Sequence, residues 1–270
     1  MAWDKPLTAA QVITRTIEML GLAAFMNRGY DSLVTQGATS VRRPKLPTLV
    51  VKKNAGTAAN SGDRKRTKTD TVMVETALDV YAVPILDEIA GKFESNDMLR
   101  QEFVKSASMH LSEEFDKACI EAAQATSNKV IMKGDVLAWE DITGINAFFN
   151  VNKVPKDGRI IVISAALETQ FWNIDVIKSA TGFNLNQLNT GKFIEIMGMK
   201  FFISGNVPQV DGKDNIIGIY GMGLAFILSK FGDIKEAYSP DELADAIDFL
   251  GHAGAELDDN KFAIVVKSKI

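Results

Sequence analysis

One long run of helical periodicity, over residues 95–125, constrains the fold of this chain more than any other feature. Apolar side chains recur there every three or four residues, which places them on one face of a helix. They are Leu99, Phe103, Ala107, Leu111, Phe115, Ala118 and Ala122. About 28 helical residues predict a rod of roughly 42 Å, and Ser95 to Asp97 offer N-caps at its start. Because the apolar face is narrow, we expect the rod to pack along one side only.

The second feature is an uneven distribution of charge. Residues 36–70 carry nine basic and two acidic side chains, a net charge of +7, whereas the remainder of the chain sums to −11. The basic residues are Arg42, Arg43, Lys45, Lys52, Lys53, Arg64, Lys65, Arg66 and Lys68. A basic arm on an acidic body predicts contact with an acidic surface, which can be nucleic acid, a membrane or the next copy of this chain.

The same part of the chain predicts an extended β-hairpin over residues 37–83. Runs at 48–51 and 69–81 are rich in β-branched residues and indicate two strands. Residues 52–68 between them are polar and contain Gly, Asn and Ser, which is typical of a loop. An isolated two-stranded hairpin is marginal in water, so this one needs support from elsewhere, and a partner subunit is the natural source.

Three interpretations of the nine basic residues remain: a solvated loop face, a DNA-binding site, or an arm that reaches a neighbouring subunit. Residues 31–80 contain no aromatic side chain, which disfavours base stacking. No recognition helix is expected to overlap the charge. We therefore favour inter-subunit contact for all nine.

The remaining pattern mixes helices and strands and predicts an α+β chain. Helices are expected at 8–27 with Thr8 as N-cap, at 167–178, and at 240–250 with Ser239 as N-cap and Pro240 in the first turn. Strands are expected at 159–164, 192–203 (broken at Gly198), 215–220, 224–229 and 261–268. Glycines at 218, 221 and 223 predict a hairpin turn between two of these strands, since their order does not fit a dinucleotide-binding loop.

The sequence offers no set of residues for catalysis, a cofactor or a metal. Cys119 is the single cysteine, which excludes an internal disulfide and fits a reducing compartment. His110 and His252 lack zinc-ligand spacing, and Asp258 with Asp259 is interpreted as a turn rather than a calcium loop.

Membrane insertion and export are not expected either. No run of about 18 apolar residues is present. Charged residues at 4, 5, 15 and 18 interrupt the apolar core that a signal peptide needs.

Two blocks within residues 154–208 carry a resemblance to a known family. The first is Val154-Pro155-Lys156-Asp157-Gly158-Arg159, followed by the apolar run Ile161-Val162-Ile163. The second comprises Leu188-Asn189-Thr190-Gly191-Lys192-Phe193 and Ile196-Met197-Gly198-Met199-Lys200-Phe201-Phe202-Ile203-Ser204-Gly205-Asn206-Val207-Pro208. In this order they resemble the major capsid proteins of tailed bacteriophages, whose fold encapsulins share. Gly37, Val41 and Pro44 are similar to residues that precede the extended loop in one lineage. Gly205 departs from the pattern, because it interrupts the usual Ser-Asn pair.

The resemblance implies an α+β major capsid protein fold with four parts. These are an N-terminal arm and helix at 1–36, an extended β-hairpin loop at 37–83, a peripheral domain from 84–135 and 230–270 with its spine helix at 95–125, and an axial domain at 136–229. The chain leaves no room for an inserted surface domain.

The function implied is structural and not enzymatic. Copies of the chain self-assemble into hexamers and pentamers of an icosahedral shell around double-stranded DNA, in a virion assembled in the host bacterial cytoplasm. Further implied partners are a separate scaffolding protein, a portal and weakly, non-specifically bound DNA; no membrane or cofactor is implied. The alternative is an encapsulin-like nanocompartment around a cargo enzyme. A soluble α+β enzyme and a nucleic-acid-binding protein acting through residues 42–68 are the other rivals.

Overall fold

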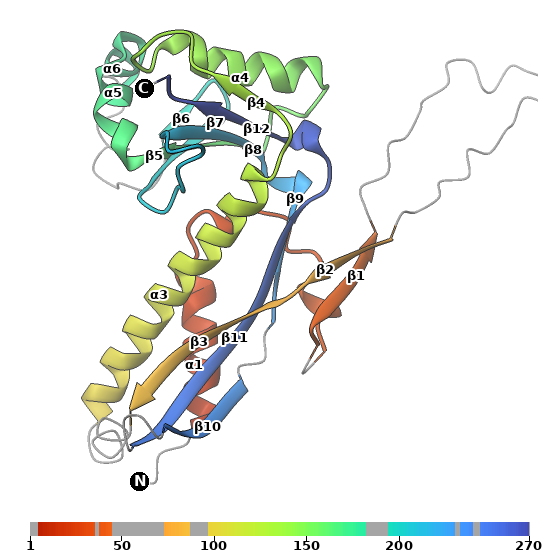
Figure 1. The fold of residues 1–270 in the computed structure, drawn as a ribbon, viewed down its shortest axis with the longest axis vertical. Helices are drawn as coiled ribbons and strands as arrows, with labels where there is room; N and C mark the ends of the chain where they lie inside the picture. Colours follow the sequence, from red (N-terminus) through yellow and green to blue (C-terminus); the bar gives the residue numbers. More distant parts are fainter. Residues whose placement is uncertain are drawn as a thin grey trace, which may run out of the picture.

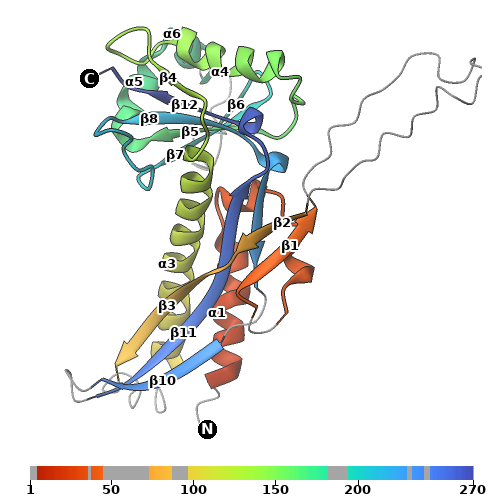
Figure 2. The same cartoon turned by 45° about the vertical axis from the view of Figure 1, so that its right-hand side comes forward.

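A six-stranded sheet, a four-stranded sheet and a two-stranded ribbon are arranged around one long helix (Figure 1). The structure, a computed structural model, describes residues 5–35, 38–44, 73–86, 97–181, 194–229, 233–239 and 244–269. The six-stranded sheet lies at one end of the helix, the four-stranded sheet runs alongside it, and the ribbon projects to one side (Figures 1 and 2). The mixed α+β arrangement agrees with the sequence prediction.

The long helix predicted at 95–125 is confirmed as α3, Asp97–Gln124, with 28 residues. Its buried side chains repeat every three or four positions, as an amphipathic helix requires. The apolar ones are Val104, Ala107, Leu111, Phe115, Cys119, Ile120 and Ala123, and the polar ones are Ser108, Ser112 and Asp116. Glu102, Lys105 and Glu113 are exposed on the other face. The helix therefore buries one side, and the other elements pack against that side.

The first helix, α1 (Lys5–Met19), packs against α3 (Figure 1). The predicted helix at 8–27 is wrong at both ends. At Gly21 a Cβ would lie 2.7 Å from a carboxylate oxygen of Asp116 on α3, so a larger residue would displace this carboxylate. The chain leaves the helix before this point and forms the single 3₁₀ turn η1, Ala23–Phe25.

The four-stranded sheet is organised around one strand of 14 residues, β11. Its strands are β3 (Asp79–Leu86), β9 (Leu224–Leu228), β10 (Asp233–Ser239) and β11 (Ala244–Leu257). The long strand pairs antiparallel with β10 and β9 along one edge and with β3 along the other. This sheet faces α1 and α3 (Figure 2).

The prediction of a helix over 240–250 is wrong, because residues 244–250 belong to β11 and Ser239 ends β10. Residues 240–243 lie outside the described part of the chain. The local sequence fits a helix cap, but β10 and β3 pair with this segment on both sides. Sheet pairing and the contact of Phe249 with Phe103, whose ring centroids lie 5.5 Å apart, override the local preference.

The six-stranded sheet is ordered β4-β12-β8-β5-β7-β6. Its strands are β4 (Lys129–Ile131), β5 (Arg159–Ser164), β6 (Ile194–Ile196), β7 (Met199–Ser204), β8 (Asn215–Tyr220) and β12 (Ala263–Lys267). The helices packed on one face are α4 (Trp139–Val151), α5 (Glu168–Asn173) and α6 (Asp175–Thr181). The end of α3 covers the opposite face. Every residue of β5 is buried, as predicted for a central strand.

The hairpin predicted between residues 215–220 and 224–229 is wrong. β8 pairs with β5 and β12, whereas β9 pairs with β11 of the other sheet. Between them the 3₁₀ turn η5 (Gly221–Gly223) passes through a crowded site. A Cβ on Gly221 would meet the carbonyl of Phe25 at 2.3 Å, and one on Gly223 would meet the Phe262 ring at 2.3 Å. These glycines therefore allow the chain to cross between sheets.

Three other predictions hold, with adjusted bounds. The helix expected at 167–178 is present as α5 and α6 with a break at Ile174. The strand break expected at Gly198 is confirmed, since Met197 and Gly198 have φ values of 57° and 74° between β6 and β7. The closing strand expected at 261–268 is β12, preceded by the 3₁₀ turn η6, Asn260–Phe262.

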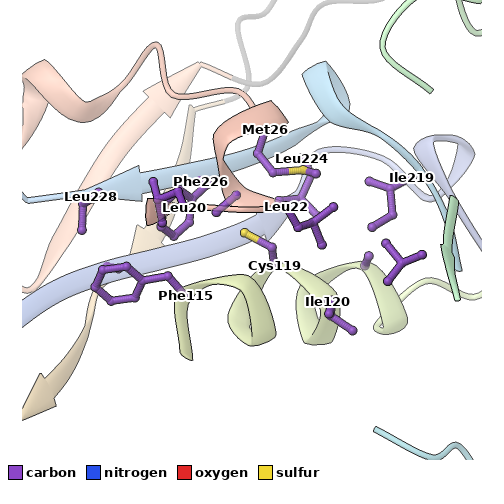
Figure 3. Close-up of a cluster of buried hydrophobic side chains, with 14 of the residues drawn as sticks. Leu20, Leu22, Met26, Phe115, Cys119, Ile120, Ile219, Leu224, Phe226 and Leu228 are labelled. Carbon is purple, nitrogen blue, oxygen red and sulfur yellow. The ribbon is translucent and has the colours of Figure 1, made fainter. Parts of the chain in front are cut away.

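One continuous core joins the two larger sheets along α3 (Figure 3). Phe115 and Cys119 of the helix face Leu22 of the N-terminal segment and Phe226 of β9. The same cluster extends to Ile219 in the six-stranded sheet. The sheets are therefore packed on a common helix rather than linked only by connecting chain.

Candidate subunit-contact site

The projecting ribbon, here called the loop stem, consists of β1 (Ser40–Pro44) and β2 (Met73–Ala77). The strands pair antiparallel, with Ser40 opposite Ala77 and Pro44 opposite Met73, as in the base of a hairpin (Figure 2). The strand predicted at 69–81 is described from Met73 onward and is interrupted at Leu78. The strand predicted at 48–51 lies outside the described residues.

The two faces of the loop stem differ in burial. Val41 and Thr76 are buried against the body, while Met73 and Glu75 are exposed. Exposed and more buried residues therefore alternate along β2, as they do in a strand with one face packed on the body. Arg42 lies on the exposed face, with its Nε 3.8 Å from a carboxylate oxygen of Glu75.

Arg43 occupies the opposite face and is fully buried. Its Nε donates a hydrogen bond to the Thr76 hydroxyl at 2.9 Å, and Nη1 donates to the carboxylate of Asp258. Nη2 lies 3.4 Å from Oε2 of Glu256, and that oxygen also accepts a 2.5 Å hydrogen bond from the Thr76 hydroxyl. The ring of Tyr30 faces the guanidinium at 5.6 Å. We call these residues the Arg43 cluster.

The N-terminal segment closes over the loop stem from the other side. The Tyr30 hydroxyl donates to the Pro44 carbonyl at 3.2 Å. Asp31 is paired with Arg28 at 2.7 Å and accepts a 3.0 Å hydrogen bond from the backbone N–H of Leu228 on β9. The stem is thus held between the N-terminal segment and the four-stranded sheet.

A close backbone approach joins the stem to β11. A Cβ at Gly254 would lie 2.1 Å from the carbonyl oxygen of Ala77, so a larger residue would push the stem away. Leu78 follows directly and is buried with Val34, Val41 and Ile227. Burial of this small apolar cluster anchors the stem on its own subunit.

The nine basic residues predicted to contact another subunit divide into three groups. Arg42 is exposed on the loop stem, where a neighbour can reach it. For Arg43 the prediction is wrong, because its guanidinium is buried in its own chain and paired with Asp258. The other seven, Lys45, Lys52, Lys53, Arg64, Lys65, Arg66 and Lys68, lie outside the described residues, so their contacts stay a prediction.

The sequence does not predict the partners of Arg43. It predicts a turn at Asp258 and Asp259, and Asp259 does cap η6 by accepting a hydrogen bond from the Lys261 N–H at 3.3 Å. Asp258 instead joins Arg43, 215 residues away in the chain. No local pattern signals a contact of that separation, because periodicity reports only neighbours along one element.

A second buried carboxylate holds the N-terminal segment on α3. Asp116 accepts a 2.7 Å hydrogen bond from the backbone N–H of Ala23, within the turn that follows α1. Burial raises the pKa of the Asp116 carboxyl above its ordinary value. Hydrogen bonds from the N–H groups of Ala23, Leu22 and Gly21 lower that pKa and offset part of this effect, while the charge of Glu113 raises it further.

This raised pKa predicts a pH dependence of the free energy of unfolding. The folded chain binds a proton at Asp116 at pH values where the unfolded chain, whose carboxyl has a pKa near 3.8, has released it. The contribution of Asp116 to the free energy of unfolding is therefore largest below the pKa of the unfolded chain. It is lost as the pH rises through the pKa of the folded chain. We expect Asp116→Asn to remove this slope in urea titrations across acidic pH, while Asp116→Ala should cost about 1–3 kcal/mol through the unsatisfied Ala23 N–H. An unchanged slope in Asp116→Asn would contradict the assignment.

No constellation of reactive side chains accompanies these contacts in the described part of the chain. His110 is exposed on α3, 3.6 Å from Glu113, and Cys119 is buried in the core. The residues described contain no group of three or more metal-ligating side chains. None of the helices described combines the length and apolar composition needed to cross a membrane.

The chain matches known proteins in structure but not in sequence. No protein-family model matches the chain, and no curated protein matches it in sequence. A structure from Mycobacterium phage Che8 matches with a TM-score of 0.61 at 16% identity, covering 92% of this chain and 90% of the other. The capsid of Ralstonia phage GP4 matches with a TM-score of 0.57 at 10% identity, over 92% and 88% of the two chains.

An encapsulin is also among the structural matches. The SrpI encapsulin of Synechococcus elongatus matches with a TM-score of 0.53 at 9% identity, over 87% of this chain and 84% of the other. At these identities the likeness concerns the fold, and it extends over nearly the whole length of each partner. The chain therefore has the HK97-like fold of tailed-phage capsid proteins, which an encapsulin also adopts.

Proposed function

We propose that this chain is the repeating subunit of a closed protein shell, specifically the icosahedral coat of a tailed phage around double-stranded DNA. The observation that carries the proposal is the fold, which matches capsid structures over about nine-tenths of both chains. The role is structural and not enzymatic. The fold's division into an arm, an extended loop at 37–83, a peripheral domain and an axial domain at 136–229 is part of the same proposal.

The charge distribution supports a contact between copies. Residues 36–70 carry +7 against −11 for the remainder, so the loop of one subunit is attracted to the body of the next. The exposed face of the loop stem, with Arg42 and Met73, is available for such a contact. A contact of loop to body is heterologous, and heterologous contacts generate closed rings when the rotation between subunits closes. Hexamers and pentamers are the rings that we propose.

The contents of the shell distinguish the phage proposal from its alternative. Most of the structural matches are tailed-phage capsids, which favours double-stranded DNA with a separate scaffolding protein and a portal, assembled in the host bacterial cytoplasm into a virion. The encapsulin match supports the second candidate, a nanocompartment around a cargo enzyme. The two candidates share the subunit and differ in what it encloses.

Electron microscopy of the purified protein tests the proposal directly. Expression of the chain alone, at physiological salt, is expected to give closed particles of uniform diameter or open rings that close when the other phage components are present. Particles from a phage-infected host should protect double-stranded DNA from nuclease, whereas a co-purified enzyme with a docking peptide would select the encapsulin alternative. A monomer at every concentration and salt condition, with and without those components, would contradict the shell function.

A further inference from the structure

The Arg43 cluster joins three parts of the chain at the point where the loop leaves the body. Arg43 and Thr76 come from the two strands of the loop stem and Tyr30 from the N-terminal segment. Glu256 lies at the end of β11, and Asp258 directly follows that strand. Arg43 and Asp258 have fully buried side chains, and Glu256 is about one-third exposed. A buried pair of charges therefore sits beneath the base of the predicted hairpin.

A buried ion pair contributes little net stability to a fold. Removing two charges from water costs about as much as their attraction returns, and apolar residues of similar size often stabilise a fold equally well. What the pair supplies instead is a fixed orientation of the strand that carries Arg43. The planar guanidinium donates in fixed directions, here toward Thr76 and Asp258, so it accepts few orientations of the strand that carries it. The apolar contacts of Val41 and Leu78 beside it are non-directional.

A small change in the orientation of the stem would displace the tip of the predicted loop by a large distance. Residues 45–72 connect β1 to β2, and 14 residues on each side can reach at most roughly 46 Å from the stem. A rotation of about 10° at the base would move a tip at that distance by roughly 8 Å. Such a displacement exceeds the length of a hydrogen bond or ion pair, so it would break contacts with a neighbouring subunit.

We infer that Arg43 and Asp258 are positioning residues, which fix the direction of the extended loop and thereby control assembly separately from the stability of the subunit. The inference rests on the proposed shell function for its assembly part. The sequence predicts that Arg43 takes part in the contact itself, whereas the geometry assigns it to the support of that contact.

The test replaces the pair without leaving a lone buried charge. In the double variant Arg43→Met with Asp258→Asn, the cluster loses its charge pair and keeps its approximate volume. We expect a thermal midpoint within a few degrees of the parent protein. Hydrogen exchange of the β1 and β2 amides should become at least tenfold faster, with no change in β5, and shell yield should fall at least tenfold. Arg42→Met is the matched control for the exchange measurement alone, because Arg42 belongs to the proposed subunit contact. It removes a positive charge from the same strand outside the cluster and should leave stem exchange unchanged.

A conservative variant covers the case in which the double variant unfolds. Arg43→Lys keeps the charge and loses the planar donor geometry, and we expect the same faster exchange at the stem in a folded subunit. Unchanged stem exchange, or normal shell yield despite faster exchange, would overturn the inference. Loss of the whole fold in both variants, with exchange raised in β5 as well, would show that the cluster is an ordinary part of the core and would overturn it too.

Failure of the inference can be separated from failure of the proposed function. The exchange measurement uses dispersed subunits and does not require a shell. If the parent protein forms no shell under any condition, the shell function fails. Fast exchange confined to the stem of the double variant would then still show that the cluster fixes the loop.

Discussion

Deletion of residues 53–68 is expected to leave a folded, soluble subunit that forms no closed shells. These residues lie between the strands predicted for the extended loop and carry Lys53, Arg64, Lys65, Arg66 and Lys68. The stem is held on the body by the Arg43 cluster and by the apolar contacts of Leu78, both outside the deletion. The fold should therefore survive, while the proposed contact with the next subunit is lost.

The deletion experiment compares thermal unfolding with particle counts from electron microscopy. We expect a thermal midpoint close to that of the parent protein and at least tenfold fewer shells. A loop of the same length made of Gly and Ser separates the effect of length from that of side chains. Normal shells from the deletion would refute the role given to the loop.

Reversal of Arg64, Lys65 and Arg66 to Glu should slow assembly at low salt, because charge attraction speeds the encounter of subunits and is screened by salt.

The second large effect is expected from Arg159→Ala, which should destabilise the six-stranded sheet by about 3 kcal/mol or more. Arg159 is the first residue of β5 and is almost fully buried. Its guanidinium donates to the carbonyls of Pro155 at 2.8 Å and Val154 at 2.5 Å, and to the side-chain oxygens of Asn150 at 3.0 Å and of Asn146. Without it, four acceptors lose their donor at once, and one of them, the Val154 carbonyl, is buried.

Urea unfolding of the dispersed subunit measures this effect. Lys156→Ala is the matched control, because Lys156 is exposed in the same turn and its removal should change the free energy of unfolding by no more than about 0.5 kcal/mol. Arg159→Lys should recover only part of the loss, since one ammonium group does not reproduce the separated donors of a guanidinium. A value for Arg159→Ala equal to that of the control would show that these hydrogen bonds contribute nothing net.

The contacts of Arg159 also give a physical reason for the sequence block in which the resemblance to capsid proteins lies. The sequence from Val154 to Arg159 resembles a pattern of capsid proteins, but the pattern alone assigns no role to its arginine. The structure gives the physical reason for the spacing: the arginine turns back onto the carbonyls of the loop that precedes it and fixes that loop against α4. Gly158, with φ of 82°, permits the turn that brings the two together.

The elements read correctly from the sequence are those whose pattern is local. The apolar repeat of α3, the unbroken apolar run of β5 and the break at Gly198 each depend on residues within one element or one turn. A helix repeats every 3.6 residues and a strand every two, so such elements can be recognised without knowledge of their neighbours. The α+β class and the likeness to capsid proteins followed from the order of these elements and from the two sequence blocks.

Other features were decided only by contacts between distant segments. Residues 244–250 become a strand because β3 and β10 pair with them, and β8 and β9 enter different sheets because the turn between them packs against Phe25 and Phe262. Arg43 changes from an expected surface charge to a buried one because Asp258 meets it. Sequence by itself therefore determined the long helix α3, the central strand β5 and the break at Gly198, whose causes lie within short stretches of chain. The tertiary structure decided which strands share a sheet and which charges are buried, because both depend on partners that no local periodicity specifies.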